Sequence, residues 1–135
     1  MSDLAPKTML KLAFLSPASF KSDGAYDIFP DVKKILRSIM LNFDYFSPQV
    51  KIYDYDAPDF FAQQARIADY SLQSARFSLE GVRIPSFKGK ITLRLKGNAQ
   101  TLKILNLILA FGELSGVGIK TSLGMGHVRV VGWGA

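Results

Sequence analysis

The sequence contains no cysteine and a single histidine, His127, and these shortages set the first limits on its chemistry. Without cysteine the chain forms no disulfide and offers no thiolate to a metal ion. One histidine is too few for a structural zinc site. We therefore expect no metal-binding site.

Long hydrophobic runs are also missing. The longest apolar stretch, residues 104–111, is interrupted by Asn106 and is far too short to cross a bilayer. Residues 1–4 lack the basic-then-apolar order of a secretion signal. We expect a cytoplasmic protein with no membrane partner. With 135 residues, 48% of them hydrophobic, the chain is expected to form one domain over residues 1–135.

Acidic residues are scarce in the second half of the chain. Residues 71–135 hold nine Lys or Arg against two Asp or Glu, whereas residues 1–70 hold eight against nine. The excess positive charge is therefore concentrated in the second half. Such a field favours RNA or DNA through counterion release, and it equally suits an anionic membrane or an acidic protein partner.

The spacing of the apolar residues predicts alternating strands and helices. Spacings of i, i+3, i+4, i+7 and i+8 indicate a helix over residues 32–40, and alternation by two indicates strands from residue 72 and at 91–95. The other expected segments are a strand at 8–15, a polar turn region at 16–25, an irregular stretch at 42–58 with one short strand at 50–53, a short helix at 59–70, a connection at 81–89, a helix at 98–114 and a strand at 127–131. The order β-α-β-β-α-β predicts an α+β, ferredoxin-like fold of the split βαβ type, with an antiparallel sheet and helices on one face.

Two of these segments carry a predicted face. The strand at 91–95 alternates apolar and basic residues, so Lys90, Arg94 and Lys96 are expected on one solvent-facing side at a pitch of about 7 Å, which can follow successive phosphates. Arg76 and Arg83 extend this surface if the register allows. The helix at 98–114, with Asn98 as its N-cap, is apolar over most of its circumference and is expected to be largely buried.

A glycine-rich loop runs from Gly116 to Gly126 and contains Lys120. Its glycines allow positive φ angles and can turn backbone N–H groups outward, which suits a phosphate. The Walker pattern fails because Ile119 precedes Lys120, and the dinucleotide pattern fails because Thr121 stands where its third glycine belongs. In both cases the expected order of strand and helix is reversed. We expect no nucleotide cofactor.

The loop has the pattern Gly-hydrophobic-Gly, then five residues that include a basic one, then Gly-x-Gly. This pattern resembles the glycine-rich loop of the RAMP superfamily of CRISPR-associated RNA-binding proteins. Residues 12–20, 28–31 and 81–93 are similar to the C-terminal domain of the CRISPR repeat-processing endoribonucleases. That family usually has Gly-Phe-x-Gly where this chain has Ser86-Phe87-Lys88-Gly89. The resemblance covers nearly the whole chain and implies a RAMP or RRM-like domain.

The resemblance implies the RNA-binding domain of an endoribonuclease that cleaves precursor CRISPR RNA within its repeats without a metal. Its implied partners are repeat RNA, a separate N-terminal-type RAMP domain or a second copy of the chain, and other CRISPR-associated proteins. The residues expected to contact RNA are Lys90, Arg94, Lys96, Gly116, Gly118, Lys120, Gly124 and Gly126. The loop and the basic strand are expected to lie together and form one binding surface.

Catalysis is less well supported by the sequence. Metal-free cleavage by a 2′-hydroxyl needs a general base, a general acid and a cation near the phosphorane. His127 is the one histidine, but the catalytic histidine of the resembled family belongs to its N-terminal domain, so a structural role for His127 is favoured. Two alternatives remain open. One is a non-catalytic RAMP subunit that holds guide RNA, and the other is a ferredoxin-like module that binds an acidic protein.

Overall fold

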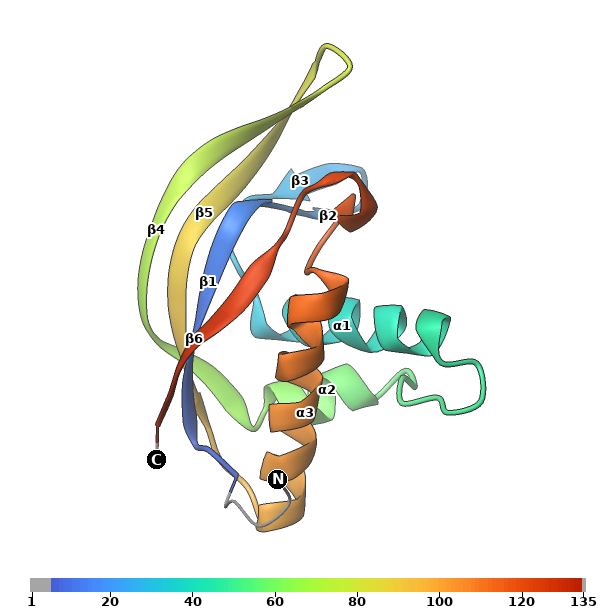
Figure 1. Ribbon diagram of the computed structural model, residues 1–135, viewed down its shortest axis with the longest axis vertical. Coiled ribbons are helices and arrows are strands. Elements are labelled where there is room, and N and C mark those ends of the chain that lie inside the picture. Colours follow the sequence, from blue (N-terminus) through green and yellow to red (C-terminus); the bar gives the residue numbers. More distant parts are fainter. Residues whose placement is uncertain (1–5, 135) are drawn as a thin grey trace.

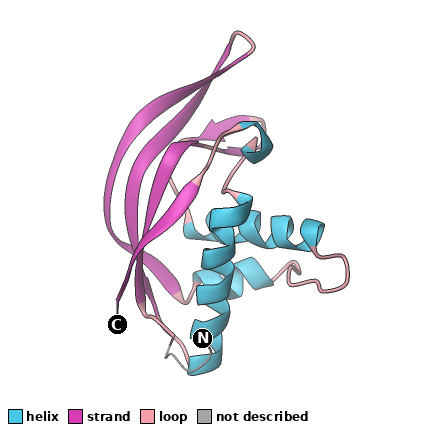
Figure 2. Cartoon of the chain, in the orientation of Figure 1, coloured by secondary structure: helices cyan, strands magenta, loops and turns pink. Residues whose placement is uncertain are grey.

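The computed structural model describes residues 6–134 and contains a four-stranded antiparallel sheet with the long helices on one face (Figures 1 and 2). The strands are β1 (Met9–Ala18), β4 (Ala65–Leu79), β5 (Val82–Leu95) and β6 (Val128–Gly134), in the spatial order β4-β5-β1-β6. The helices are α1 (Val32–Phe46), the short α2 (Ala57–Ala62) and α3 (Ala99–Ser115). Strand order and connections are those of the predicted ferredoxin-like fold, which is confirmed.

The alternation of residues in β1 shows how the sheet acquires two different faces. Leu10, Leu12 and Phe14 are buried against the helices, whereas Lys11 between them is exposed. Buried residues of α1 and α3, among them Ile39 of α1, complete the core on that side. The opposite face of the sheet is left without a covering helix (Figure 1).

Both long helices begin at a residue whose side chain caps the first turn, and Asn98 is the predicted cap of α3. The Asp31 carboxylate accepts the Lys34 N–H at 3.1 Å, and the Asn98 side chain accepts the Thr101 N–H at 2.8 Å. No helix within residues 6–134 is both long and apolar enough to cross a membrane. Residues 1–4, on which the expectation of no secretion signal rests, lie outside the described residues.

The segment from 59 to 70 was predicted as a helix, and this is wrong for most of its length. Helix α2 ends at Ala62 and β4 begins at Ala65. The β4–β5 register shifts between Ile67 and Asp69, which marks a β-bulge. The bulge breaks the alternation by two that would have identified a strand from the sequence.

The predicted connection at 81–89 is also wrong, because β5 begins at Val82 and forms a long hairpin with β4. The turn needs only Glu80 and Gly81, which both have positive φ angles, as a two-residue hairpin turn requires. Pro85 is tolerated because the pairing with β1 ends at Phe87, so that the rest of the hairpin projects as a two-stranded ribbon (Figure 1).

The polar region at 16–25 and the stretch at 42–58 also differ from expectation. Strand β1 continues to Ala18, and a small hairpin follows, made of β2 (Phe20–Ser22) and β3 (Ala25–Asp27). Helix α1 extends to Phe46, and no strand forms at 50–53. Instead, the two carboxylate oxygens of Asp44 accept the N–H groups of Ile52 and Tyr53, at 2.7 and 3.0 Å, and hold that segment against α1.

Helix α3 is less buried than its composition predicted. Leu105, Ile108 and Leu109 pack into the core, but the side chains of Leu107 and Leu114 are 65% and 82% exposed. One stripe of the helix therefore faces outward and keeps its apolar character.

Candidate nucleic-acid interface

The uncovered face of the sheet carries a set of exposed basic side chains contributed by all four strands. The register places Lys90 of β5 opposite Ala13 of β1, and Ala13 opposite Arg129 of β6, so the three residues form one row across the sheet. Directly paired residues of antiparallel strands share a face. Lys11 lies on the same face of β1, two residues from Ala13.

A second group of cations lies at the end of this face where β5 terminates. Arg66 of β4 stands directly opposite Arg94 of β5. Together with Lys96 and the amides of Gln63 and Gln64 they line a notch of about 140 Å³. Like charges placed opposite each other on neighbouring strands repel, and a bound anion would relieve that repulsion.

We call these six residues the basic face: Lys11, Arg66, Lys90, Arg94, Lys96 and Arg129. All of them are exposed, and none takes part in the ion pairs found among residues 6–134, which are Lys33–Asp59 and Lys34–Asp27. None of these six charges is therefore held in a direct ion pair within the described part of the chain. This agrees with the expected solvent-facing position of Lys90, Arg94 and Lys96.

The glycine-rich loop has a different construction, in which its glycines serve the packing of the chain. A Cβ on Gly118 would lie 2.4 Å from the Ser19 carbonyl oxygen, and one on Gly126 would lie 1.9 Å from that of Val117. Both glycines also have positive φ angles, of 94° and 69°. These positions admit no side chain without moving the backbone. Gly116 and Gly124 likewise have positive φ angles.

The N–H groups of this loop are mostly used inside the protein. The N–H groups of Val117, Ile119 and Gly126 donate to backbone carbonyls at 2.8–3.0 Å, and that of Gly118 donates to the Ser38 hydroxyl at 2.9 Å. The expectation that the loop turns its amides outward is therefore wrong for these residues. What the loop presents to solvent is the exposed side chain of Lys120.

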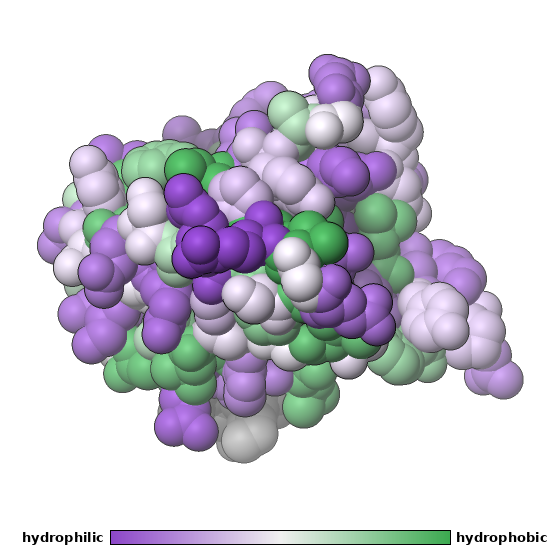
Figure 3. Space-filling view, turned by 90° about the horizontal axis from the view of Figure 1, so that it is seen from above, coloured by the Kyte–Doolittle hydropathy of each residue, from purple (hydrophilic) through white to green (hydrophobic). Residues whose placement is uncertain are grey.

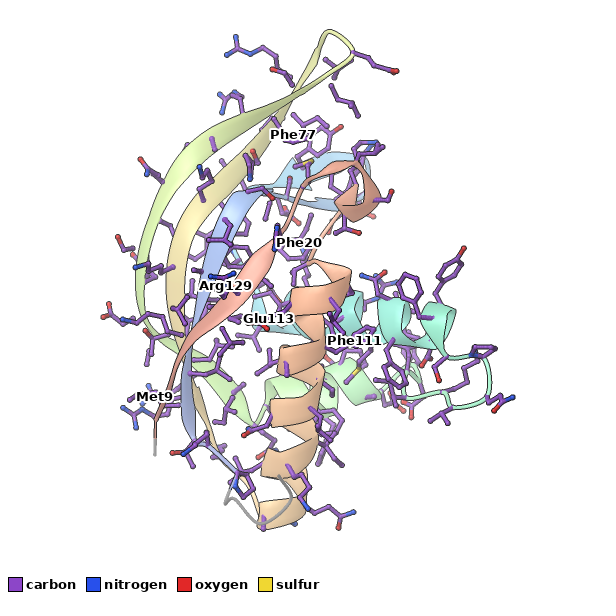
Figure 4. All side chains as sticks on the ribbon, viewed as in Figure 1. Met9, Phe20, Phe77, Phe111, Glu113 and Arg129 are labelled. Carbon is purple, nitrogen blue, oxygen red and sulfur yellow. The ribbon has the colours of Figure 1, made fainter. Side chains whose placement is uncertain are left out.

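The glycine-rich loop lies at one end of the basic face, three residues before Arg129, whereas Arg94 lies at the other end, contrary to the expectation that the loop and Arg94 are close together. Gly126 N–H donates to the Pro17 carbonyl, and Gly124 packs toward Phe77 of the projecting hairpin, so the loop lies at the far end of β1 (Figures 1 and 4). At that end Ala18 pairs with Phe87. Arg94 is seven residues further along β5, which is roughly 23 Å at the rise of a strand.

Arg76 and Arg83 lie on the projecting hairpin, on the loop side of the molecule rather than beside Arg94. Arg76 pairs with Pro85 and Arg83 with Ser78, and both side chains are exposed. Figure 3 looks onto this end and shows strongly hydrophilic residues next to apolar ones. The register places Arg76 and Arg83 on the face of the hairpin opposite to Phe77, the residue that approaches the loop.

His127 contributes to the structure through its backbone. Its N–H donates to the Ser16 hydroxyl at 2.9 Å, and its carbonyl accepts the Leu15 N–H at 2.7 Å. These bonds fix the start of β6 against β1, whereas the residue itself is exposed. This arrangement agrees with the favoured structural role. Within residues 6–134, no group of side chains is arranged to hold a metal ion.

Sequence reasoning missed three members of the basic face. Lys11 was hidden in a nearly continuous apolar run, although it is the one charged residue of β1. Arg66 was assigned to a helix because of the bulge in β4, and Arg129 belongs to the short alternation of β6. Only the cross-strand register brings them beside Lys90 and Arg94.

The strand order, the glycine-rich loop before the last strand and the basic face define a ferredoxin-like domain of the RAMP class. The profile of the family of CRISPR-associated endoribonuclease Cas6 matches residues 12–128. The chain belongs to this family.

Two curated relatives bear the same name. The CRISPR-associated endoribonuclease Cas6 of Streptococcus thermophilus is 37% identical over 125 residues, which are 92% of this chain and 51% of that protein. The Cas6 of Mycobacterium tuberculosis strain H37Rv is 33% identical over 125 residues, which are 89% of this chain and 38% of that protein. The chain thus spans about half or less of the length of these relatives.

Solved Cas6 structures have the same fold. A Cas6 product complex superposes with a TM-score of 0.82 at 25% identity, covering 94% of this chain and 52% of that one. Thermus thermophilus Cas6 superposes with a TM-score of 0.79 at 27% identity, covering 94% of this chain and 55% of that one. The similarity again covers one half of the longer protein.

Proposed function

We propose that this chain is the RNA-binding domain of an endoribonuclease that processes precursor CRISPR RNA by metal-independent cleavage within its repeats. Membership of the Cas6 family supports the class of activity. The observation that carries RNA binding is the basic face, six exposed cations without ion-pair partners in the described part of the chain. Such a face binds a phosphate backbone by releasing condensed counterions.

The geometry suits different parts of the domain to different contacts with RNA. Rows of cations on the sheet, such as Lys90 and Arg129, match an extended or duplex backbone, and the notch at Arg66 and Arg94 suits a single phosphate group. Lys120 supplies a separate contact at the loop end. Gly116, Gly118, Gly124 and Gly126 then act by shaping the loop rather than by donating to RNA.

We assign the acid–base chemistry of cleavage to a second domain. His127 is exposed, its backbone is hydrogen-bonded to residues 15 and 16, and its imidazole makes no hydrogen bond to a residue of 6–134. The curated relatives are longer than this chain, which leaves room in them for such a domain. In this proposal the partners are repeat RNA, that second domain or a second copy, and other CRISPR-associated proteins, all in the cytoplasm.

The test is a binding titration followed by a cleavage assay. Fluorescence anisotropy with a CRISPR repeat hairpin and with a scrambled hairpin, in EDTA and at several salt concentrations, measures affinity and the number of phosphates contacted. We expect tighter binding of the repeat and a steep salt dependence. Absence of RNA binding at moderate salt would instead favour a protein-binding module.

Cleavage separates the two RNA-binding alternatives. When a histidine-bearing N-terminal Cas6 domain is added in EDTA, an endoribonuclease domain supports cutting of the repeat, whereas a guide-holding subunit only binds it. We expect His127→Ala to leave the cleavage rate within a few-fold of wild type. A loss of about 10²-fold or more would identify His127 as an acid–base group after all.

A further inference from the structure

A basic cleft lies on the helical side of the sheet, away from the basic face. It is formed by the first turns of α1, by β2 and by the start of the glycine-rich loop, and its volume is about 470 Å³. That volume falls within the range of small-molecule sites. Its lining residues are Phe20, Lys21, Ser22, Asp31, Lys33, Lys34, Arg37, Ser38, Leu41, Asn42, Gly118 and Ile119.

The cations of the cleft fall into two pairs with different surroundings. Lys33 and Lys34 are held by Asp59 and Asp27 at the rim, so their positions are fixed and their charges partly offset. Arg37 and Lys21 are exposed and take part in neither of these ion pairs. A guanidinium without a carboxylate partner is well suited to bind a phosphate through two hydrogen bonds.

The other groups of the cleft favour a nucleotide over a bare anion. Leu41 and Ile119 provide apolar surface against which a base can pack. The Asn42 amide can read the edge of a base, and the Asp31 carboxylate can accept a hydrogen bond from a ribose hydroxyl or an amino group. An inorganic anion would gain nothing from the apolar surface of Leu41 and Ile119 and would be repelled by the Asp31 carboxylate.

The cleft is also preformed. The Ser38 hydroxyl on α1 accepts the Gly118 N–H at 2.9 Å, which ties the loop to the helix. Ile119 N–H donates to the Ser19 carbonyl at 3.0 Å and fixes the loop to the end of β1. The walls are therefore held by hydrogen bonds before any ligand enters, which lowers the entropic cost of binding.

We propose that this cleft binds one nucleotide of single-stranded RNA, with its phosphate on Arg37 and Lys21. The inference rests on the proposed RNA-binding function and adds a site for unpaired RNA on the side of the sheet opposite the basic face. An RNA that passes over the loop end near Lys120 can contact both sites.

The first test compares an RNA hairpin with and without a single-stranded oligoadenylate tail. Wild type binds the tailed RNA more tightly, and Arg37→Gln and Lys21→Gln each reduce that advantage by about tenfold, the loss expected for one charge-assisted contact, without changing affinity for the blunt hairpin. Lys103→Gln, the same charge change at an exposed position of α3, keeps the advantage. If both cleft variants still prefer the tailed hairpin to the blunt hairpin as strongly as wild type does, the proposal is wrong.

The second test makes failure of the cleft distinguishable from failure of the proposed function. If wild type binds neither hairpin, RNA binding as proposed is wrong, and adenosine 5′-monophosphate is then titrated against the full chain by NMR. Shifts of the amide signals of Ser22, Ser38 and Gly118 that are lost in Arg37→Gln support the cleft. No shifts, or equal affinity for inorganic phosphate, contradict a nucleotide site.

Discussion

The glycine-rich loop and half of the basic face can be recognised in the sequence, yet the structure holds the loop and the face in opposite ways. In the loop, Gly118 and Gly126 pack against carbonyl oxygens and the N–H groups donate inward. On the basic face, cations such as Lys90 and Arg94 point into solvent without ion-pair partners among residues 6–134. The comparison teaches that the loop serves mainly the fold, whereas the face is free to serve binding.

The largest effect is expected from Gly126→Ala, which should unfold the domain or lower its free energy of unfolding by more than about 4 kcal/mol. The new Cβ would lie 1.9 Å from the Val117 carbonyl oxygen, at a backbone position with φ of 69°. Urea denaturation followed by circular dichroism measures the change.

Gly81→Ala is the matched control for this prediction. Gly81 also has a positive φ, of 82°, but a Cβ there would meet nothing within 4 Å. Its cost should therefore be only the backbone strain, about 1 kcal/mol. Equal losses in the two variants would show that φ alone, and not the close packing of the loop, sets the cost.

The next effect concerns RNA. The double variant Arg66→Ala and Arg94→Ala should weaken binding of repeat RNA by about 10²-fold and reduce the slope of log K against log salt by about two. Its thermal stability should stay the same or rise slightly, because two opposed like charges are removed. Anisotropy and thermal melts test both statements, with Lys103→Ala as the control for losing one positive charge outside the basic face.

An unchanged salt slope in that double variant would remove the notch from the RNA site. A large loss of stability would contradict the contrast between face and loop, since it would mean that the two arginines support the fold.

Lys120 lies in the glycine-rich loop but has an exposed charge like the residues of the basic face. Its variants can therefore separate an effect on stability from an effect on RNA binding. It has a positive φ of 54°, which is strained for a residue with a side chain, and its side chain is exposed. Lys120→Gly should stabilise the domain by about 0.5 kcal/mol by relieving that strain, yet weaken RNA binding about threefold by removing the charge. Lys120→Ala should weaken binding equally without the gain in stability. Full RNA affinity in both variants would exclude Lys120 from the interface.

Much of the fold follows from local signals in the sequence. The spacing of Ile35, Leu36 and Ile39 marks α1, and Asn98 marks the start of α3, because each signal depends on neighbours along the chain. Where the sequence failed, long-range or irregular contacts decide. The bulge between Ile67 and Asp69 hides a strand, and the Asp44 carboxylate takes the N–H groups that a strand at 50–53 would have used.

The candidate site divides in the same way. Lys90, Arg94 and Lys96 were found because basic residues alternate with apolar ones along the end of β5 and the residue that follows it. Lys11 and Arg129 join them only through the register of β1 with its neighbours, which periodicity does not encode. The cleft beside α1 was not predicted from the sequence either. Arg37 looks like part of an ordinary solvated helix face until β2 and the loop are placed beside it.

The smallest effect is expected at the rim of that cleft, from the ion pair between Lys34 and Asp27. Lys34 beside it, with help from the Ser22 hydroxyl, holds the pKa of Asp27 below its ordinary value. A carboxylate with a lowered folded-state pKa stabilises the fold above its unfolded-state pKa, and this stabilisation is lost as the pH falls through the folded-state pKa.

Lys34→Gln should therefore lower the melting temperature by no more than a few degrees at neutral pH. The difference from wild type should vanish in acid, where Asp27 is protonated in both proteins. Melting curves over a pH series measure it, with Lys103→Gln as control, and a difference that persists in acid would show that Lys34 stabilises the domain by packing rather than by charge.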